Sequence, residues 1–328
     1  MPLFDCSMTT KTQPINVDYT YRYLVALLLL VLAQNAVADL NLDGPNPAAT
    51  DVELFLGASE SEFRWNIAGD ANGENPNILS ELTWRDVKSN GVGISITSVT
   101  EKSLVGILDL FYAEIDSGNV QDSDYFDDGK NNEFLRSYSS TDGETMNASY
   151  QLGWMNKIRG IDVVPLVAVT YAAQKFNTFD GVTTVNTLVP NDIGPFEGLN
   201  SSFDTRWVGA GLGILAEHNW HSKLYIKLNI TSYYFDYDAD ANWNLRADFA
   251  HPVSFSHEGE GYGMNATIQL GWQISTKYRV LLRAESFKWR IDEGVDYVFF
   301  SNGTEGETQL NETVLESTGL FLGVRYTL

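Results

Sequence analysis

Four aspartates fall within seven residues of the stretch GNVQDSDYFDD at positions 118–128: Asp122, Asp124, Asp127 and Asp128. Carboxylates this close repel one another, and a strand seldom places several of them together. Three uses would offset that cost. A close pair can share a proton and work as acid and base, several carboxylate oxygens can bind a hard cation such as Ca²⁺, or the charges can stay in water. The choice depends on where the fold places this stretch.

An export signal is predicted at the start of the chain. Arg22 precedes an apolar run at 23–33 (YLVALLLLVLA), and the small residues AVA at 36–38 form a cleavage site. The run is shorter than the roughly 20 apolar residues that a spanning helix needs. We therefore expect residues 1–38 to be a secretory signal peptide and residues 39–328 to form the mature domain.

The composition restricts the partners. The chain carries 43 acidic residues against 21 Lys and Arg, for a net charge of −22. This excess disfavours nucleic acid and suits a cationic ligand or metal ions. The single cysteine, Cys6, lies in the predicted signal, so the mature chain would have no disulfide. Met1 and Met8 are both candidate start residues.

Apolar and polar residues alternate over long stretches. In residues 263–275 (GMNATIQLGWQIS), every even position is apolar and every odd position is polar or glycine. The residues 146–154, 224–231 and 320–328 show the same alternation, except that odd positions 225 and 321 are Tyr and Phe. A period of two over this length predicts strands with one face in an apolar medium.

Short and long connections follow one another between these stretches. The short ones lie at 156–160, 217–222 and 275–278, and the long polar ones at about 119–144, 178–200, 241–258 and 300–312. Short turns at one rim and long loops at the other are typical of an outer-membrane β-barrel. We predict an all-β fold, an antiparallel transmembrane β-barrel of about ten strands with long extracellular loops, in the outer membrane of a Gram-negative bacterium. The expected strands are 51–66, 78–98, 103–118, 144–156, 161–177, 201–216, 223–240, 259–275, 279–296 and 313–328.

On this map the acidic stretch lies just past the top of the third strand, at the extracellular rim. It does not follow the EF-hand pattern, because the fifth position counted from Asp122 is Phe126 and the glycine falls at the eighth position. A looser Ca²⁺ site and a solvated acidic loop both remain alternatives.

The chain resembles the omptins, outer-membrane proteases whose active site is a cleft at the extracellular mouth. The resemblance covers nearly all of the mature chain in strand order and loop placement. It is carried by LTWRD at 82–86, which opens the second strand, and by NVQDSDYFD at 119–127. In the family, two catalytic aspartates precede an aromatic residue at the latter position. The resemblance therefore implies a divergent member with Asp122 and Asp124 in an aspartyl-type catalytic site.

The top of the seventh predicted strand resembles the opposite wall of the omptin cleft. Asp240 matches the aspartate of a catalytic Asp-x-His pair, and Asn242 stands where the family has the histidine. Asp238 and Glu62 match two acids that receive a basic substrate side chain. The residues themselves indicate no cofactor, and only the resemblance raises lipopolysaccharide as one, since omptins require it.

Asn242 separates two hypotheses about function. Peptide hydrolysis by water needs a proton acceptor, which a carboxylate–histidine pair provides and an asparagine does not. His251 and His257, near the same rim, are candidates to replace that base. The first hypothesis is a cell-surface endopeptidase for basic peptides with an altered catalytic site. The second is a catalytically inactive omptin-like barrel that serves as an adhesin or binding surface.

The expected partners follow from these hypotheses. They are outer-membrane lipid, lipopolysaccharide, and a basic peptide or protein, with no nucleic acid and with the chain as a monomer. A small channel is disfavoured, because side chains largely fill a barrel of about ten strands.

Overall fold

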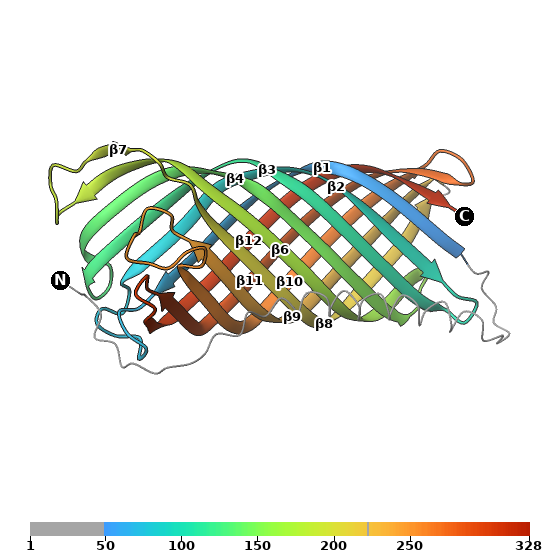
Figure 1. The fold of residues 1–328 in the computed structure, drawn as a ribbon. Coiled ribbons are helices and arrows are strands. Elements are labelled where there is room, and N and C mark those ends of the chain that lie inside the picture. Colours follow the sequence, from blue (N-terminus) through green and yellow to red (C-terminus); the bar gives the residue numbers. More distant parts are fainter. Residues whose placement is uncertain (1–48, 222) are drawn as a thin grey trace.

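A computed structural model describes residues 49–221 and 223–328, which form one long β-barrel (Figure 1). In this described part, ten long antiparallel strands make the wall. They are β1 (Ala49–Ile67), β2 (Ser80–Val99), β3 (Leu104–Asp127), β4 (Asn131–Trp154), β6 (Ile161–Asn186), β8 (Ser201–His221), β9 (Leu224–Asn242), β10 (Phe255–Gln273), β11 (Tyr278–Phe299) and β12 (Glu305–Thr327). Two three-residue strands, β5 (Asn156–Ile158) and β7 (Gly194–Phe196), pair with β6. The predicted signal peptide and Cys6 lie outside the described residues.

The sheet closes on itself, which confirms the predicted barrel. Each long strand pairs with its neighbours along the chain, with β4 bonded to β6. The first strand pairs with the last over nearly its whole length, from Asp51 opposite Thr327 to Ile67 opposite Leu310. Closure removes the free edges at which strands of other chains would add.

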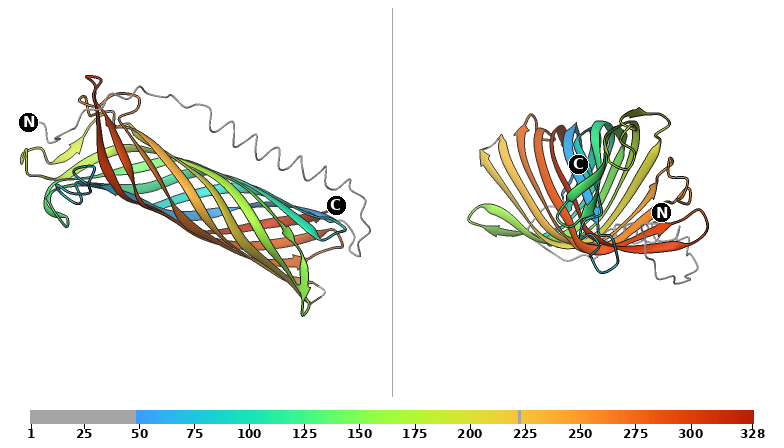
Figure 2. Two further views of the ribbon diagram at one scale, coloured as in Figure 1. Left: turned by 90° about the horizontal axis from the view of Figure 1, so that it is seen from below. Right: turned by 90° about the vertical axis from the view of Figure 1, so that its left-hand side faces the viewer.

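The two ends of the barrel differ in their connections. Segments 68–79, 187–200 and 243–254 join strands at one end, on the left in Figure 1. The other end has the short connections 100–103 and 274–277, and β1 begins there beside the C-terminus. The left view in Figure 2 shows the same tilted strands running between these two ends. Because the longer loops of such barrels face outward, the left end is extracellular.

The extracellular parts of the strands extend further than the alternation predicts. Residues 119–144, expected as a loop, are mostly paired strand, because β3 continues to Asp127 and β4 starts again at Asn131. Likewise β6 continues to Asn186. Beyond the membrane neither face of a strand has to be uniformly apolar, so the period-two signal weakens there although the backbone ladder continues.

The membrane-facing band occupies the lower part of the strands. On β9, Leu224, Ile226, Leu228 and Ile230 point outward, and Tyr234 is the last large apolar side chain on that face, 55% exposed. A membrane strand needs about 9–11 residues, so the parts above this level stand outside the bilayer. We call these parts the projecting half. The part of the chain that the structure describes has no helix long and apolar enough to span a membrane.

Inside the projecting half lies an aromatic cluster. Its rings come from strands all round the barrel and are nearly all buried completely; they include Phe63, Trp65, Trp84, Phe176, Phe203, Trp207, Phe235, Tyr237, Phe255 and Trp289. Phe63, for example, lies 5.3–5.7 Å from Trp84, Phe176 and Phe203, measured between ring centroids. The interior of this half is therefore packed like the core of a soluble protein.

Candidate functional site at the extracellular end

The side chains of Asp122 and Asp124 point toward the barrel interior. Below them, β3 is irregular: residues 116–118 have no register partner on β4, and the pairing resumes at Asn119. Such a bulge can exchange the two faces of a strand. Ile115 and Val120, an odd and an even position, both point into the aromatic cluster, 4% and 2% exposed. The two aspartates share the face of Val120.

This position changes the acidity of the pair. Burial raises the pKa of Asp122 well above its usual value, and the neighbouring charge of Asp124 raises it further. Burial also raises the pKa of Asp124, to about 6, although a hydrogen bond from the Ser80 side chain opposes the shift. Both groups stand above the membrane band. The pair therefore holds a proton to a higher pH than separate carboxyls in water do, as expected of two close carboxylates where water is restricted.

One cation faces the pair from the loop at 243–254. The Arg246 guanidinium lowers the pKa of both aspartates by its charge. It is held by two bonds to Asp248, of 3.0 and 2.8 Å, and lies 4.1 Å above the Phe249 ring. Sequence reasoning missed Arg246, because no local motif shows which loop folds over β3.

The other two aspartates of the stretch stabilise a turn. The Asp128 carboxylate accepts a 2.7 Å hydrogen bond from the backbone N–H of Asn77, and Asp127 bonds to the side chain of Asn132. Within the described residues, no group of three or more His, Cys, Asp or Glu side chains is placed to hold a metal ion. The acidic stretch is thus divided between a shielded pair and a hydrogen-bonded turn.

Asp238 and Asp240 occupy the outer face of the barrel. On β9 the inward positions are odd, as the buried residues Tyr237 and Ala239 show, so both aspartates point away from the interior. Both bind Arg206 on β8, which lies 3.0 Å from Asp240. Burial raises the pKa of Asp238, and the Arg206 charge and hydrogen bond oppose that shift.

The two acids expected to receive a basic side chain lie apart. Glu62 is on the outward face of β1 and sits 3.6 Å from Arg64, whereas Asp238 is on β9. The strands β10, β11 and β12 separate β1 from β9 in the wall. The structure therefore does not bring Glu62 and Asp238 into one recess.

Asn242 contacts a histidine without joining the acid pair. Its Oδ1 lies 2.8 Å from Nδ1 of His251. The other candidate base, His257, is fully buried, with its Nε2 3.3 Å from Asp296 and its ring 4.8 Å from that of Trp65. Among the described residues, no hydrogen bond or ion pair joins Asp122 or Asp124 to Asp240 or Asn242.

The space between the two expected walls of a cleft is occupied. Phe203 is fully buried and contacts rings from the other side of the barrel, at 6.0 Å from Trp65 and 5.4 Å from Trp84. Trp84 is on β2, the strand next to β3, and Trp65 is on β1, one strand further along the wall. The arrangement thus offers a shielded acid pair on the inside and an acidic surface on the outside.

A family model described as Pom, Protochlamydia outer membrane protein, matches residues 53–328. The chain belongs to the Pom family. Its barrel accordingly lies in the outer membrane of a Gram-negative bacterium, as the alternation predicts. No curated protein matches the sequence.

Two solved structures can be compared with this Pom barrel. It is similar to the outer membrane protease OmpT from Escherichia coli, with a TM-score of 0.73 and 10% identity over 89% of this chain and all of that one. The translocator domain of the autotransporter NalP from Neisseria meningitidis has a TM-score of 0.36 and 12% identity, over 95% of this chain and 99% of that one. At 10% identity the likeness to OmpT shows the fold alone.

Proposed function

We propose that this Pom barrel is a non-catalytic surface protein whose projecting half binds a cationic protein or peptide. The support is an acidic face on the outside of β8, β9 and β10, above the membrane band. There Asp236 lies opposite Glu260, Asp238 opposite Glu258, and Asp204 opposite Asp240. We call these residues the acidic face.

Like charges opposite each other across a ladder destabilise a sheet. Burial raises the pKa of Asp236, and the charge of Glu260 adds to this. Burial also raises the pKa of Asp204, and the charge of Asp240 adds to the shift, whereas the charge of Lys175, opposite it on β6, opposes the shift. Arg206 offsets the repulsion at Asp238 and Asp240. A ligand with several positive charges would offset the rest, so the face is arranged for a cationic partner.

Binding of decalysine to the refolded protein in detergent tests the proposal. We expect saturable binding that weakens steeply with salt, since exposed charges are screened. The double variant Asp236→Asn/Glu260→Gln should bind about tenfold more weakly, which corresponds to about 1.4 kcal/mol.

A matched control removes a facing acid pair elsewhere. Glu62 and Glu316 lie opposite each other on β1 and β12, and both side chains are exposed. Their double substitution to Gln changes the net charge equally and should leave decalysine affinity within a factor of about two, well under 1.4 kcal/mol. An equal loss of decalysine affinity in both variants would show that binding depends only on net charge, and it would contradict specific binding at the acidic face.

Proteolysis is the second candidate, and one observation favours it. Asp122 and Asp124 form a close acid pair whose pKa values are both raised, the condition for sharing a proton in acid–base catalysis. Incubation of the refolded protein with a dibasic peptide, with and without lipopolysaccharide, separates the candidates. Cleavage that disappears in Asp122→Asn would favour the endopeptidase over the binding surface.

A further inference from the structure

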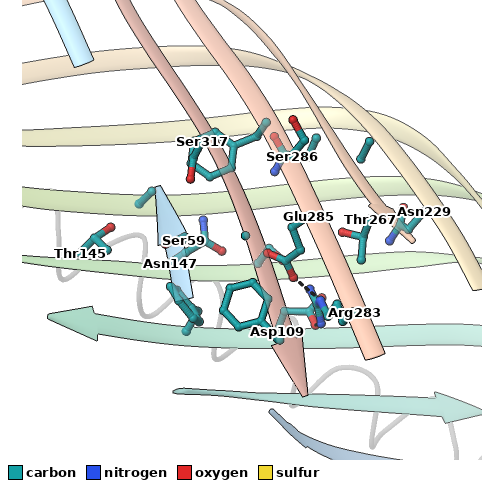
Figure 3. Close-up of a pocket in the computed structure, with 18 of the residues that line it drawn as sticks. Ser59, Asp109, Thr145, Asn147, Asn229, Thr267, Arg283, Glu285, Ser286 and Ser317 are labelled. Atoms are coloured by element: carbon teal, nitrogen blue, oxygen red, sulfur yellow. Dashed lines mark ion pairs between the residues drawn. The ribbon is translucent and has the colours of Figure 1, made fainter. Parts of the chain in front are cut away.

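A cavity of about 140 Å³ lies in the lumen, within the part of the barrel that crosses the membrane (Figure 3). Side chains from nine of the ten long strands of the described chain line it. Most of them are hydroxyls and amides, such as Ser59, Thr145, Asn147, Asn229 and Ser317, which Figure 3 shows around one space.

The charges in this lining balance one another. Asp109 and Glu285 are the acids, and Lys227 and Arg283 are the bases. Arg283 pairs with Glu285 and lies 3.7 Å from Asp109. A charged ligand would break this balance in a space with little water, so the lining selects a neutral one.

The remaining polar and aromatic groups indicate what kind of neutral ligand fits. The Gln174 side chain is only 7% exposed, and its Oε1 has no hydrogen-bond partner. A buried acceptor without a partner costs free energy until a donor reaches it. Phe287 and Trp289 stack at 4.6 Å beside the cavity and offer an apolar surface. Donors, acceptors and a ring surface together suit a polyol, which has hydroxyls and C–H groups.

Groups of different kinds stand at the two ends of the cavity. Toward the extracellular end stand Trp289 and Leu315 of the aromatic cluster, 2% and 1% exposed. Toward the periplasmic end, Arg325 pairs with Glu53 at 2.6 Å, and Gln269 donates to Glu53 at 3.2 Å. Packed rings move little, whereas long polar side chains can exchange partners with water. Entry from the periplasmic end is therefore the easier route.

We propose that the lumen cavity binds a small neutral polyol that enters from the periplasmic end. The size is limited to about six to eight non-hydrogen atoms, since a cavity of about 150 Å³ accepts benzene. Glycerol and erythritol fall within this range. The proposal concerns the lumen and is independent of the acidic face.

Titration calorimetry of the refolded full chain with erythritol tests the site. We expect one saturable site per chain, with benzene and the glycerate anion binding at least tenfold more weakly. Ser317→Phe fills the cavity and should weaken erythritol binding at least tenfold. Thr318→Phe, the next residue on the outward face, adds the same ring outside the barrel and should leave it unchanged. Lack of saturation, equal effects of the two variants, or stronger binding of benzene would overturn the proposal.

The entry route has its own test. The double variant Glu53→Gln/Arg325→Gln removes this ion pair and leaves the net charge unchanged. Erythritol exchange, followed by NMR line shape, should become at least tenfold faster, with the affinity nearly unchanged. An unchanged exchange rate in the folded variant would exclude the periplasmic route.

Discussion

The membrane-spanning half and the projecting half of this barrel use the same strands with opposite polarity. Along β9 the outward side chains change from Leu224 and Leu228 to Asp236, while the inward ones change from Lys227 to Phe235. In the bilayer the apolar face must look outward, and in water it must look inward. A single closed sheet is thus stable in both lipid and water because its apolar face changes from the outside to the inside along each strand.

The inversion decides where a functional site can lie. In the membrane half the polar groups surround an internal cavity, whereas in the projecting half they cover the outside. A cleft between the walls of the projecting half would have to displace packed aromatic rings. The difference between the two halves therefore favours a binding surface on the projecting half. Substitutions that disrupt the packing of either half test this difference.

The largest effect should come from the aromatic cluster. Trp84 is completely buried, so Trp84→Ala should lower the free energy of unfolding by about 3–5 kcal/mol. Ser95, which is 1% exposed and points into the membrane-level lumen, serves as the control. Ser95→Ala should cost about 1 kcal/mol or less, because only one hydroxyl group is removed and no large cavity forms. Urea unfolding in lipid vesicles measures both, and similar costs would contradict the difference between the halves.

The lipid-facing side should give the next largest effect. Leu322 is 61% exposed within the apolar band, and Leu322→Arg should destabilise the inserted barrel by about 2–4 kcal/mol. Thr318 lies on the same face of β12, four residues nearer the extracellular end. There the cost of arginine should fall to about 0–1 kcal/mol, because the side chain reaches the interface. Equal losses at both positions would place the membrane boundary higher than the side chains indicate.

The sequence allows the membrane half to be predicted well and the projecting half less so. Strict alternation at 263–275 marks β10, because one face must be apolar along the whole bilayer. The upper part of β3 lacks that constraint, and the prediction ended the strand at residue 118. From Leu224 to Ile230 the even positions face outward. Extending this alternation along the same strand would have placed Asp238 and Asp240 on the outside of the barrel.

The acid pair could not be placed in the same way. In the lower part of β3, Leu110 and Tyr112 are exposed, so simple alternation would put Asp122 on the outside as well. The bulge at residues 116–118 exchanges the faces, and nothing in the local sequence shows it. The pairing of Arg206 with Asp238 likewise depends on cross-strand register. The residue types in the sequence were enough to select the acidic residues. Which of these residues contact one another depends on the strand register, which the sequence does not show.

The acid pair gives a smaller, pH-dependent effect. Burial raises the pKa of Asp124 from 3.8 to about 6, so the folded state binds more protons than the unfolded state between these values. Its contribution to stability is therefore most favourable below about pH 4 and declines as pH rises through about 6. Asp124→Asn should stabilise the protein at pH 8 by about 1–3 kcal/mol and have little effect at pH 4.

Urea midpoints across this pH range, compared between the variant and the wild type, measure that difference. The groups that act on Asp124 are Asp122, Arg246, Glu133 and the Ser80 side chain. Asp127→Asn, in the neighbouring turn, serves as the charge-matched control and should not give the same dependence. A stability difference that grows toward low pH would contradict the shielded position of the pair.

The smallest effect on stability, and the sharpest test of the two halves, should come from Asn242→His. The residue lies at a wet rim, so the change should cost within about 0.5 kcal/mol. It restores the histidine of the omptin pattern beside Asp240. If the projecting half were a catalytic groove, cleavage of a dibasic peptide would rise by orders of magnitude, since a missing base costs that much. We expect no gain, because Arg206 holds Asp240 on the outer face and Asn242 contacts His251 instead of the acid pair. Peptide cleavage with lipopolysaccharide present, in wild type, Asn242→His and Asn242→His/Asp122→Ala, decides the matter. A large gain in cleavage for Asn242→His that Asp122→Ala abolishes would show that these residues act in one catalytic site. The protease hypothesis would then replace the proposed binding surface.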